Sequence, residues 1–253
     1  MKKDMVIAID VGNTTVSVGI FDKGVLKTVT TIRTIKPASD EYYTKAFKGI
    51  IRHNVIEGAV ISSVVPQTTR SLKRIFTRSL KIKHSVVGED ITVPIKNLYK
   101  DPRQVGQDRL VNAYAGYAKF GGGLIIVDFG TAVTFDIISR NGAYVGGIIV
   151  PGMETALHAL SAHAALLPMV TVSKPASLIG KDTVESMLSG IVNGYGALCA
   201  GLVNKIRKEV GRGYSVIFTG GHAGIISRYC RHDSIQPNLT LEGLYLLYQR
   251  KSL

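Results

Sequence analysis

Hydrophobic residues along the chain form short β-rich runs that alternate with longer amphipathic stretches. Residues 6–24 and 125–142 each contain an apolar run, an acid, a glycine turn, a second apolar run and a second glycine turn. This order predicts two β-hairpins. The run 58–66 between them predicts a buried strand that ends at a turn, while 38–52 and 67–81 predict helices. The pattern is that of an α/β protein.

The two hairpin regions share one register. Asp10 corresponds to Asp128, Gly12 to Gly130 and Gly24 to Gly142, at a constant offset of 118 positions. A repeat of this kind predicts two similar half-domains, which we place at residues 1–117 and 118–253. With 253 residues, 45% of them hydrophobic, the chain is long enough for two small domains with cores.

Each hairpin turn carries residue types that suit a phosphate group. Gly12 and Gly130 allow a ligand to approach the backbone closely, and small polar residues stand beside them, namely Asn13, Thr14 and Thr131. Asp10 and Asp128 end apolar runs, where an acid is costly to bury unless it meets a cation or a donor. A single D-x-G is also an ordinary tight turn, but two in register favour a nucleotide cleft between facing half-domains.

An amphipathic helix is predicted to begin close to Gly106, which places Asp108 and Arg109 in its first turn. An acid at this position has a structural interpretation, because it stabilises the backbone N–H groups at a helix N-terminus. Further on, the glycine-rich stretch 144–152 suits either turns or a substrate wall, and a helix is predicted after it.

The last third of the chain predicts a long helical region entered through 181–183, where Thr183 is either a cap or a ligand contact. Residues 215–226 predict a strand, the pair Gly220 and Gly221, and a helix whose N-terminus could meet a nucleotide. No Walker-type P-loop and no G-x-G-x-x-G is present, so other nucleotide folds are unsupported.

Composition narrows the setting. The net charge of +13 includes a stripe of basic residues at 70–83, which suits either a solvated helix face or a nucleic-acid contact. The stripe has few aromatic residues and no known nucleic-acid-binding motif to favour the latter. Neither Cys199 nor Cys230 has metal-ligand spacing, so two unpaired thiols in a reducing cytoplasm are expected. The sequence is interpreted as having no apolar run of about 18 residues without a charge, so we expect no membrane-spanning helix. His158 and His163 are five positions apart and are interpreted as structural.

Several motifs together resemble the type III pantothenate kinase family of the acetate-kinase, sugar-kinase, heat-shock-protein and actin superfamily. They occur in the family's order as DVGNTTVSVG, GQDR, DFGTAVTFD, GGIIVPG with AALLP, and TGG. Gln107 occupies a variable position of the motif, and Asp182 stands where the family often has Asn. The resemblance implies two duplicated actin-like, or ribonuclease H-like, half-domains.

The resemblance also implies the reaction, in which the ATP γ-phosphate passes to pantothenate and gives 4′-phosphopantothenate for coenzyme A synthesis. Asp108 is then the general base. The residues implied for ATP are Asp10, Val11, Gly12, Asn13, Thr14, Thr15, Val16, Ser17 and Thr131. Those implied for pantothenate are Tyr99, Gly106, Gln107, Asp108, Arg109 and Thr183.

Cofactors and partners follow from the same resemblance. Mg²⁺ accompanies ATP, Asp128 matches a monovalent-cation position for K⁺ or NH₄⁺, and the expected assembly is a cytoplasmic homodimer without membrane or nucleic-acid contact. Two alternatives stay open at this point. One is a transcriptional regulator of the same fold, and the other is a kinase of this fold that acts on another small hydroxy acid.

Overall fold

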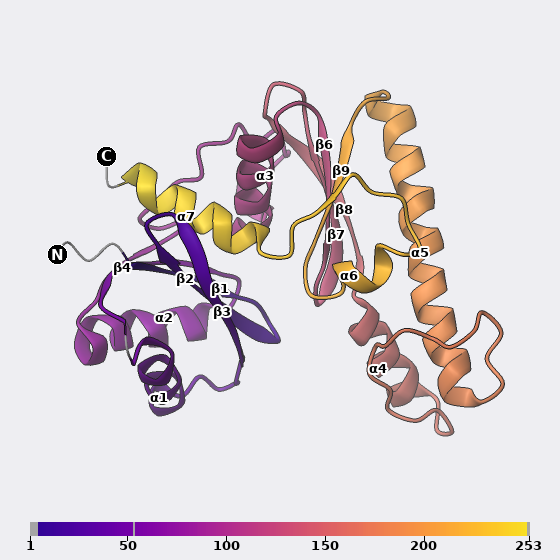
Figure 1. Ribbon diagram of the computed structural model, residues 1–253, viewed down its shortest axis with the longest axis horizontal. Helices are drawn as coiled ribbons and strands as arrows, with labels where there is room; N and C mark the ends of the chain where they lie inside the picture. The colour runs from indigo at the N-terminus through magenta and orange to yellow at the C-terminus, as the bar shows by residue number, and fades with distance from the viewer. Residues whose placement is uncertain (1–4, 53, 252–253) are drawn as a thin grey trace. The chain divides into compact units, whose positions relative to one another are not determined.

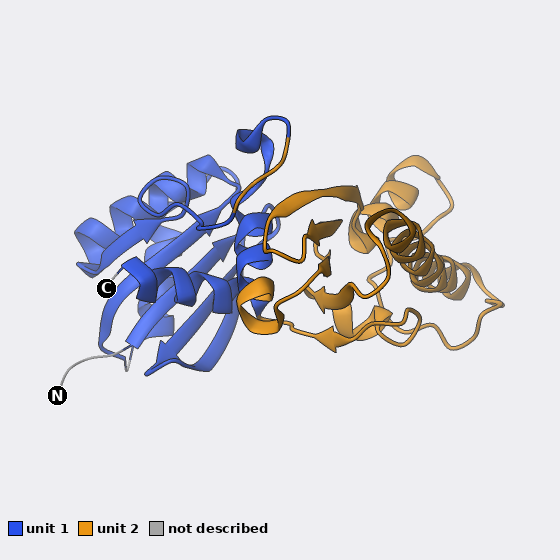
Figure 2. Ribbon diagram, turned by 90° about the horizontal axis from the view of Figure 1, so that it is seen from above, with its two compact units in different colours: residues 1–95, 100–115, 239–253 blue, residues 96–99, 116–238 orange. Residues whose placement is uncertain are grey.

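The chain folds into two compact units. The computed structural model describes residues 5–52 and 54–251. Unit 1 comprises residues 1–95, 100–115 and 239–253, and unit 2 comprises 96–99 and 116–238 (Figure 2). Each unit contains one five-stranded mixed sheet, and each sheet begins with an antiparallel hairpin followed by a third antiparallel strand. The α/β class and the two hairpins predicted from the sequence are confirmed.

The sheet of unit 1 has the order β3-β2-β1-β4-β5 (Figure 1). Its strands are β1 (Met5–Val11), β2 (Thr15–Asp22), β3 (Val25–Arg33), β4 (Ile56–Ser63) and β5 (Lys83–Val86). Strands β1, β4 and β5 run parallel, so they need connections that cross over the sheet. The helices α1 (Asp40–Ile51) and α2 (Pro66–Arg74) cover one face and bury Tyr43, Phe47 and Leu72 against it.

Local sequence explains where these helices begin and end. The Ser39 side chain accepts a hydrogen bond from the Tyr42 N–H and caps α1, while Pro66 occupies the first turn of α2, where its missing N–H costs nothing. After Arg74 the helix widens into a π-helical segment, η1 (Ile75–Leu80), which ends at Lys81 with a positive φ of 54°. The helices predicted at 38–52 and 67–81 are therefore present, the second with a change of helical type.

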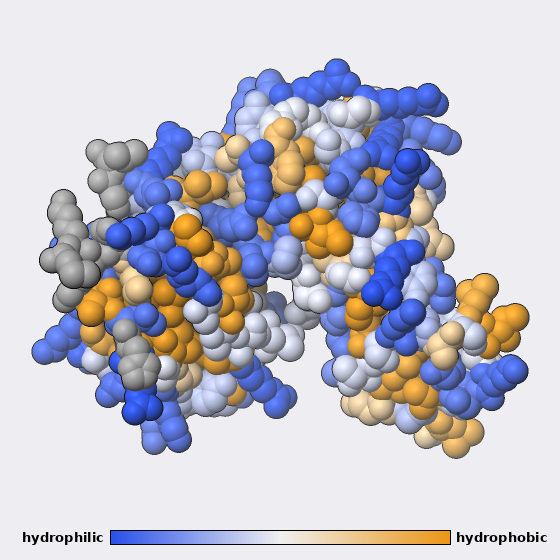
Figure 3. Space-filling model, in the orientation of Figure 1, coloured by the Kyte–Doolittle hydropathy of each residue, from blue (hydrophilic) through white to orange (hydrophobic). Residues whose placement is uncertain are grey.

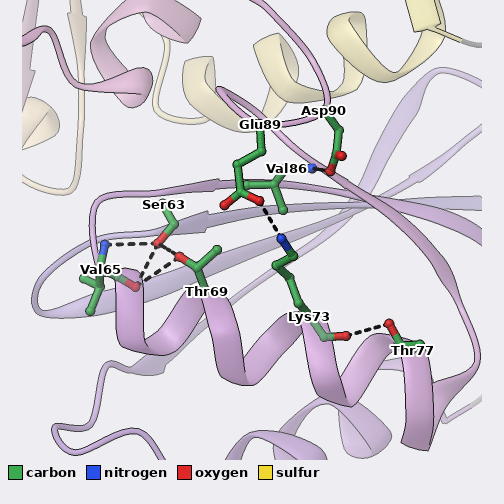
Figure 4. A network of polar contacts seen from close by, with 8 residues as sticks. All are labelled: Ser63, Val65, Thr69, Lys73, Thr77, Val86, Glu89 and Asp90. Carbon is green, nitrogen blue, oxygen red and sulfur yellow. Dashed lines mark hydrogen bonds and ion pairs between the residues drawn. The ribbon is translucent and has the colours of Figure 1, made fainter. Parts of the chain in front are cut away.

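The basic stripe lies on this helical layer. Arg70, Arg74 and Arg78 are all exposed. Arg74 donates two hydrogen bonds to the Asp40 carboxylate at 2.7 and 2.9 Å, which holds the pKa of Asp40 below its usual range. Figure 4 shows a second ion pair on the same helix, between Lys73 and Glu89. Part of the stripe is thus paired with acids of unit 1.

The other face of the unit 1 sheet is covered by a helix from the far end of the chain. Helix α7 (Leu239–Lys251) lies along β1, β2 and β4, and the ring of Tyr245 stacks on Phe21 with centroids 4.4 Å apart. Gly58 leaves the room that the Tyr248 side chain fills. The predicted halves meet at 117/118, whereas the compact units divide after Ala115 and assign 239–253 to unit 1, because α7 buries its apolar side there.

Unit 2 repeats the same sheet. Its order β8-β7-β6-β9-β10 matches that of unit 1 strand for strand, with β6 (Leu124–Phe129), β7 (Ala132–Ile138), β8 (Tyr144–Pro151), β9 (Ser215–Thr219) and β10 (Ser234–Ile235). The two hairpin turns differ in length. Four residues separate the pair Val11 and Val16, whereas three separate Phe129 and Val133, so the second hairpin turn is one residue shorter.

The helices of unit 2 are α4 (Met153–His163), α5 (Thr183–Val210) and α6 (Ala223–Ile226), and they share a core with β6, β7 and β9. Helix α3 (Gln107–Phe120) follows the short helix η2 (Pro102–Gln104) and passes from unit 1 into unit 2 at Gly116. Gly116 brings α3 against Ile126 and Leu124, on the opposite face of the sheet from the core that α4 and α5 cover.

Helix α5 corrects one expectation about hydropathy. Residues 186–204 contain no charged side chain, and α5 is long and apolar enough to cross a membrane by length and composition alone. Its buried residues Met187, Val192 and Cys199 belong to the core of unit 2. The packing of α5 against the sheet therefore accounts for its apolar composition.

Candidate functional site

The first hairpin turn, residues 12–15, joins β1 to β2. The Gly12 N–H donates to the Thr15 carbonyl oxygen at 2.9 Å and closes the turn beyond the last strand pair, Val11 and Val16. A Cβ on Gly12 would lie 3.2 Å from that carbonyl oxygen, so the turn has little room for a larger residue. Asp10, half-buried at the end of β1, stands opposite Ser17 across the ladder. The turn thus presents its small polar residues just beyond an acid.

Thr34 and Lys36, which follow β3 in the chain, contact this turn. Thr34 is buried, and its N–H donates to the Thr14 carbonyl oxygen at 2.9 Å while its hydroxyl donates to the Gly12 carbonyl oxygen at 2.8 Å. The exposed Lys36 places its ammonium 3.0 Å from the Asn13 side-chain oxygen. Thr34 therefore holds the first hairpin turn through its N–H and its hydroxyl, and Lys36 places one positive charge beside the turn.

The second hairpin turn, residues 130–132, joins β6 to β7 and is held differently. The Gly130 N–H donates to the Ala132 carbonyl oxygen at 3.1 Å. Gly152, just before α4, packs its backbone on Gly130 and Thr131, so that a Cβ there would collide with their carbonyl oxygens. The Gly152 N–H and the Thr155 hydroxyl both donate to the Thr131 carbonyl oxygen, at 3.0 and 2.8 Å.

A third glycine packs on the acid that precedes this turn. Gly220 has a φ of +86°, which favours glycine, and a Cβ on it would collide with the Asp128 carboxylate and lie 2.6 Å from the Phe129 nitrogen. The GG loop, residues 220–222, is thereby fixed against the end of β6, and the His222 N–H donates to the Phe129 carbonyl oxygen at 3.3 Å. The helix predicted after this loop is only the four-residue α6, too short to offer an anion-binding N-terminus.

Asp108 lies in the first turn of α3, as predicted. One of its carboxylate oxygens accepts the Arg109 N–H at 2.9 Å, and this bond satisfies a backbone donor that has no partner within the helix. Burial raises the pKa of Asp108 above its usual range, although the Arg109 N–H and the Arg109 charge pull in the opposite direction. Gly106 packs its backbone against the same carboxylate. An acid with a raised pKa at a partly open helix start is typical of proton-transfer residues.

The start of α3 and the first hairpin turn lie near each other within unit 1. Val64, at the end of β4, donates its N–H to the Val11 carbonyl oxygen at 3.0 Å. A side-chain methyl of Val64 lies 3.9 Å from the Cβ position of Gly106. The β4–α2 connection is itself fixed by Ser63, whose hydroxyl accepts from the Val65 N–H and from Thr69 (Figure 4). Val64 therefore links the residue after Asp10 with the residue before the GQDR helix.

Two further predicted residues belong to unit 2. Tyr99 lies beside Tyr144 at the start of β8, with ring centroids 6.4 Å apart, and its N–H is bonded to the Asn97 side chain at 3.0 Å. Thr183 is the exposed first residue of α5, whose cap is the Asp182 side chain bonded to the Glu185 N–H at 2.8 Å. Thr183 is thus not the cap. It lines a pocket of about 580 Å³ with Leu167, Gly180, Lys181, Asp182, Ser186 and Met187.

A family model for type III pantothenate kinase matches residues 6–205 of the chain, which include both hairpins and Asp108. The chain belongs to the type III pantothenate kinase family. It is therefore a kinase that phosphorylates pantothenate in coenzyme A biosynthesis with ATP as donor, and the activity predicted from the motifs is confirmed.

Solved structures with similar folds agree with the two-sheet architecture of this kinase. One is a conserved protein of Campylobacter jejuni named for the Baf family of transcriptional activators, with 20% identity, a TM-score of 0.59, and coverage of 97% of this chain and 98% of that one. Another is the ethanolamine utilization protein EutJ of Carboxydothermus hydrogenoformans, with 15% identity, a TM-score of 0.59, and coverage of 98% and 91%.

A third similar structure is a ROK family glucokinase of Streptomyces griseus in complex with glucose and AMPPNP. It has 11% identity, a TM-score of 0.55, and coverage of 97% of this chain and 99% of that one. At such identities these likenesses concern the fold alone. They confirm that each sheet of the kinase belongs to an actin-like half.

Sequence reasoning missed the residues that hold the turns of the kinase. Thr34 and Lys36 follow an edge strand with no motif around them, and only their position after β3 could have drawn attention to them. Asp136 was also missed as a separate feature. It is fully buried, and its carboxylate accepts from the Tyr144 hydroxyl at 2.8 Å and from the Thr134 hydroxyl at 3.1 Å. A buried acid of this kind fixes Tyr144, the neighbour of Tyr99.

Proposed function

We propose that Asp108 is the general base that takes the proton from the pantothenate hydroxyl as the γ-phosphate is transferred. The observation that carries this role is the carboxylate at the first turn of α3, half-buried and with its pKa raised by burial. An alcohol ionises far above neutral pH, so a carboxylate within hydrogen-bond reach makes it a better nucleophile as the bond to phosphorus forms.

The neighbours of Asp108 are assigned to pantothenate binding. The planar guanidinium of Arg109 matches a carboxylate, and pantothenate carries one. Arg109 is buried, which strengthens a charge-assisted contact relative to one in bulk water. The remaining residues assigned to pantothenate are Tyr99, Gly106, Gln107 and Thr183. The exposed position of Thr183 on its pocket supports a role as a contact.

The hairpin turns are assigned to the ATP phosphates. The first turn offers backbone donors and small side chains, and the residues assigned are Asp10, Val11, Gly12, Asn13, Thr14, Thr15, Val16 and Ser17. Thr131 is assigned the same role in the second turn. Glycine packing and the Thr34 hydrogen bonds fix both backbones before a ligand arrives, so less conformational entropy is lost on binding.

The acids at the ends of β1 and β6 suit cations. Asp10 offers a carboxylate next to the phosphate turn, the type of oxygen ligand that Mg²⁺ prefers, and Mg²⁺ would neutralise charge on the transferred phosphate. Asp128 is assigned a monovalent cation, K⁺ or NH₄⁺. Its carboxylate lies against the Gly220 backbone, in a cradle that a Cβ would fill, and this fit supports the assignment. Replacing K⁺ by Na⁺ is expected to lower activity sharply.

We further propose a cytoplasmic homodimer. Figure 3 shows apolar side chains at the end of unit 2 where α4 and its connection to α5 lie. The exposed large apolar residues of this segment are Leu160, Leu166, Met169, Leu178 and Ile179. Leu166 is 93% exposed, and exposed apolar groups of this size indicate a contact surface. Light scattering should give twice the chain mass, and Leu166→Asp should halve it. The two free thiols, Cys199 and Cys230, suit a reducing compartment.

ADP release with ATP, Mg²⁺ and K⁺, measured with and without pantothenate, tests the role of Asp108. Asp108→Asn should lower turnover by about 100-fold or more while ADP binding persists. Asp101→Asn is the matched control, since Asp101 caps the preceding short helix η2 and pairs with Arg103. Near-normal turnover of Asp108→Asn would contradict the base assignment, and ADP release without pantothenate dependence would indicate another acceptor.

The raised pKa of Asp108 adds a prediction about pH. Because only the ionised carboxylate accepts a proton, kcat/KM should fall with decreasing pH through a value above the ordinary carboxyl range of about 4. A raised native pKa also means that ionising Asp108 costs stability above its unfolded pKa. Asp108→Asn should therefore raise Tm at neutral pH, and the gain should vanish in acid. A Tm gain that persists at low pH would show that another cause is responsible.

A further inference from the structure

The first turn of α4 contacts two loops of unit 2, the second hairpin turn, which is assigned to the ATP phosphates, and the GG loop. Thr155 donates its hydroxyl to the Thr131 carbonyl oxygen at 2.8 Å, which ties α4 to the second hairpin turn. The next residue back, Glu154, points its carboxylate toward the GG loop, and the His222 ring nitrogen lies 3.7 Å from one of its oxygens. Two adjacent side chains thus connect two loops that are far apart in sequence.

The same Glu154 oxygen has a second partner. It accepts the Val172 N–H at 2.9 Å, and the Val172 side chain is buried in the core of unit 2. The other Glu154 oxygen lies 4.0 Å from the His158 ring one turn along α4. One carboxylate therefore fixes the long α4–α5 connection to the helix while it faces His222.

The GG loop is fixed at its backbone as well. Gly220 packs on Asp128, and the His222 N–H is bonded to Phe129, so the loop is held at the end of β6. Glu154 adds a side-chain contact with His222 of this loop, and the second hairpin turn is attached to the same end of α4 through Gly152 and Thr155. Helix α4 therefore adds contacts to both loops.

We infer that Glu154 and Thr155 are positioning residues for ATP, which act by holding the second hairpin turn and the GG loop at one spacing. The inference rests on the proposed function, in which the second hairpin turn contacts the ATP phosphates, and on the sequence expectation that the segment containing the GG loop meets the nucleotide. Neither residue takes part in the chemical step, so their loss should raise the KM for ATP and leave the KM for pantothenate and kcat nearly unchanged.

The test compares four variants by direct ADP titration and by steady-state kinetics. Thr155→Val removes the hydroxyl, and Thr155→Ser keeps it as the conservative rescue. Thr155 is exposed, so these changes leave the core intact. Glu154→Ala removes the contacts with Val172, His222 and His158, whereas Glu154→Gln keeps an oxygen for the Val172 N–H and loses the charge that faces His222.

We expect Thr155→Val to weaken ADP binding and raise the KM for ATP about five-fold, the worth of one hydrogen bond, with Thr155→Ser near the wild-type values. Glu154→Ala should have a larger effect than Glu154→Gln. Unchanged ADP affinity in both Thr155→Val and Glu154→Ala would overturn the inference alone. Failure of the wild-type chain to bind ADP would overturn the proposed nucleotide site as well, which separates the two outcomes.

Discussion

The two hairpin turns occupy equivalent places in two equivalent sheets, yet they are held by different means. The first is held by hydrogen bonds, since the N–H and the hydroxyl of Thr34 each bond one of its carbonyl oxygens and Lys36 contacts Asn13. The second also accepts hydrogen bonds, from the Gly152 N–H and the Thr155 hydroxyl, but close backbone packing is added to them, since Gly152 and Gly220 leave no room for a Cβ against the turn and its acid. The repeat preserves the strand order but not the way in which the turns are supported.

This difference teaches how each half should respond to change. A hydrogen bond lost to a conservative substitution costs about 1 kcal/mol, because water can partly replace it. Water cannot relieve the steric clash of a Cβ placed against tightly packed backbone, so the backbone itself must move. We therefore expect the second turn to tolerate substitution of its supporting residues less well than the first.

The largest effect is expected for Gly220→Ala. The φ of +86° and the contact of a Cβ with Phe129 should together lower the free energy of unfolding by roughly 2–4 kcal/mol. ATP turnover should fall with it, because Asp128 is displaced. Gly12→Ala is the matched change in the first turn, where the neighbouring oxygen must yield by only a few tenths of an ångström. Equal losses in urea unfolding for the two variants would break the comparison.

A smaller effect is expected for Thr34→Val. The substitution keeps the shape of the side chain and the backbone bond to Thr14, but it removes the hydroxyl that donates to Gly12. The free energy of unfolding should fall by about 1 kcal/mol. Thr34→Ser retains the hydroxyl and should recover most of the loss in the same thermal or urea titration. A Thr34→Val loss as large as that of Gly220→Ala would show that side-chain support is no more tolerant.

The smallest effect is expected for Lys36→Met, because Lys36 is exposed and water screens its charge. Loss of the ammonium beside Asn13 should raise the KM for ATP about three-fold without changing Tm. Added salt should reduce the difference between wild type and variant. Lys36→Arg keeps the charge and should stay close to wild type; a loss of the same size there would point to Lys36 geometry rather than charge.

Local patterns made much of the fold predictable. The hairpins follow from apolar runs that end at glycine turns, and the start of α3 follows from Pro102 and Gly106 ahead of an amphipathic stretch. The residues of the first turn could also be identified from the sequence, since an acid, a glycine and small polar residues stand together at 10–15. These features were predictable because each depends on residues that are neighbours in the sequence.

The remaining features depend on contacts between distant residues. Thr34 meets Gly12 only because β3 returns beside β2, and Glu154 meets His222 only through the sheet order of unit 2. The π-helical segment after Arg74 and the short α6 differ from the expected helices because tertiary packing overrides local propensity. Support for a site is therefore harder to predict than its motif.

Helix α7 carries a consequence for synthesis of the chain. The face of the first sheet that Tyr245 and Tyr248 cover belongs to strands that precede unit 2 in the chain, whereas the covering helix follows unit 2. During synthesis, α7 therefore reaches Phe21 and the space above Gly58 only after unit 2 has been made. Unit 2, continuous from residue 116 to 238, has all but four of its residues in one stretch and can complete its core earlier. Unit 1, whose strands precede unit 2 in the chain, can therefore complete its core only after unit 2 has been synthesised.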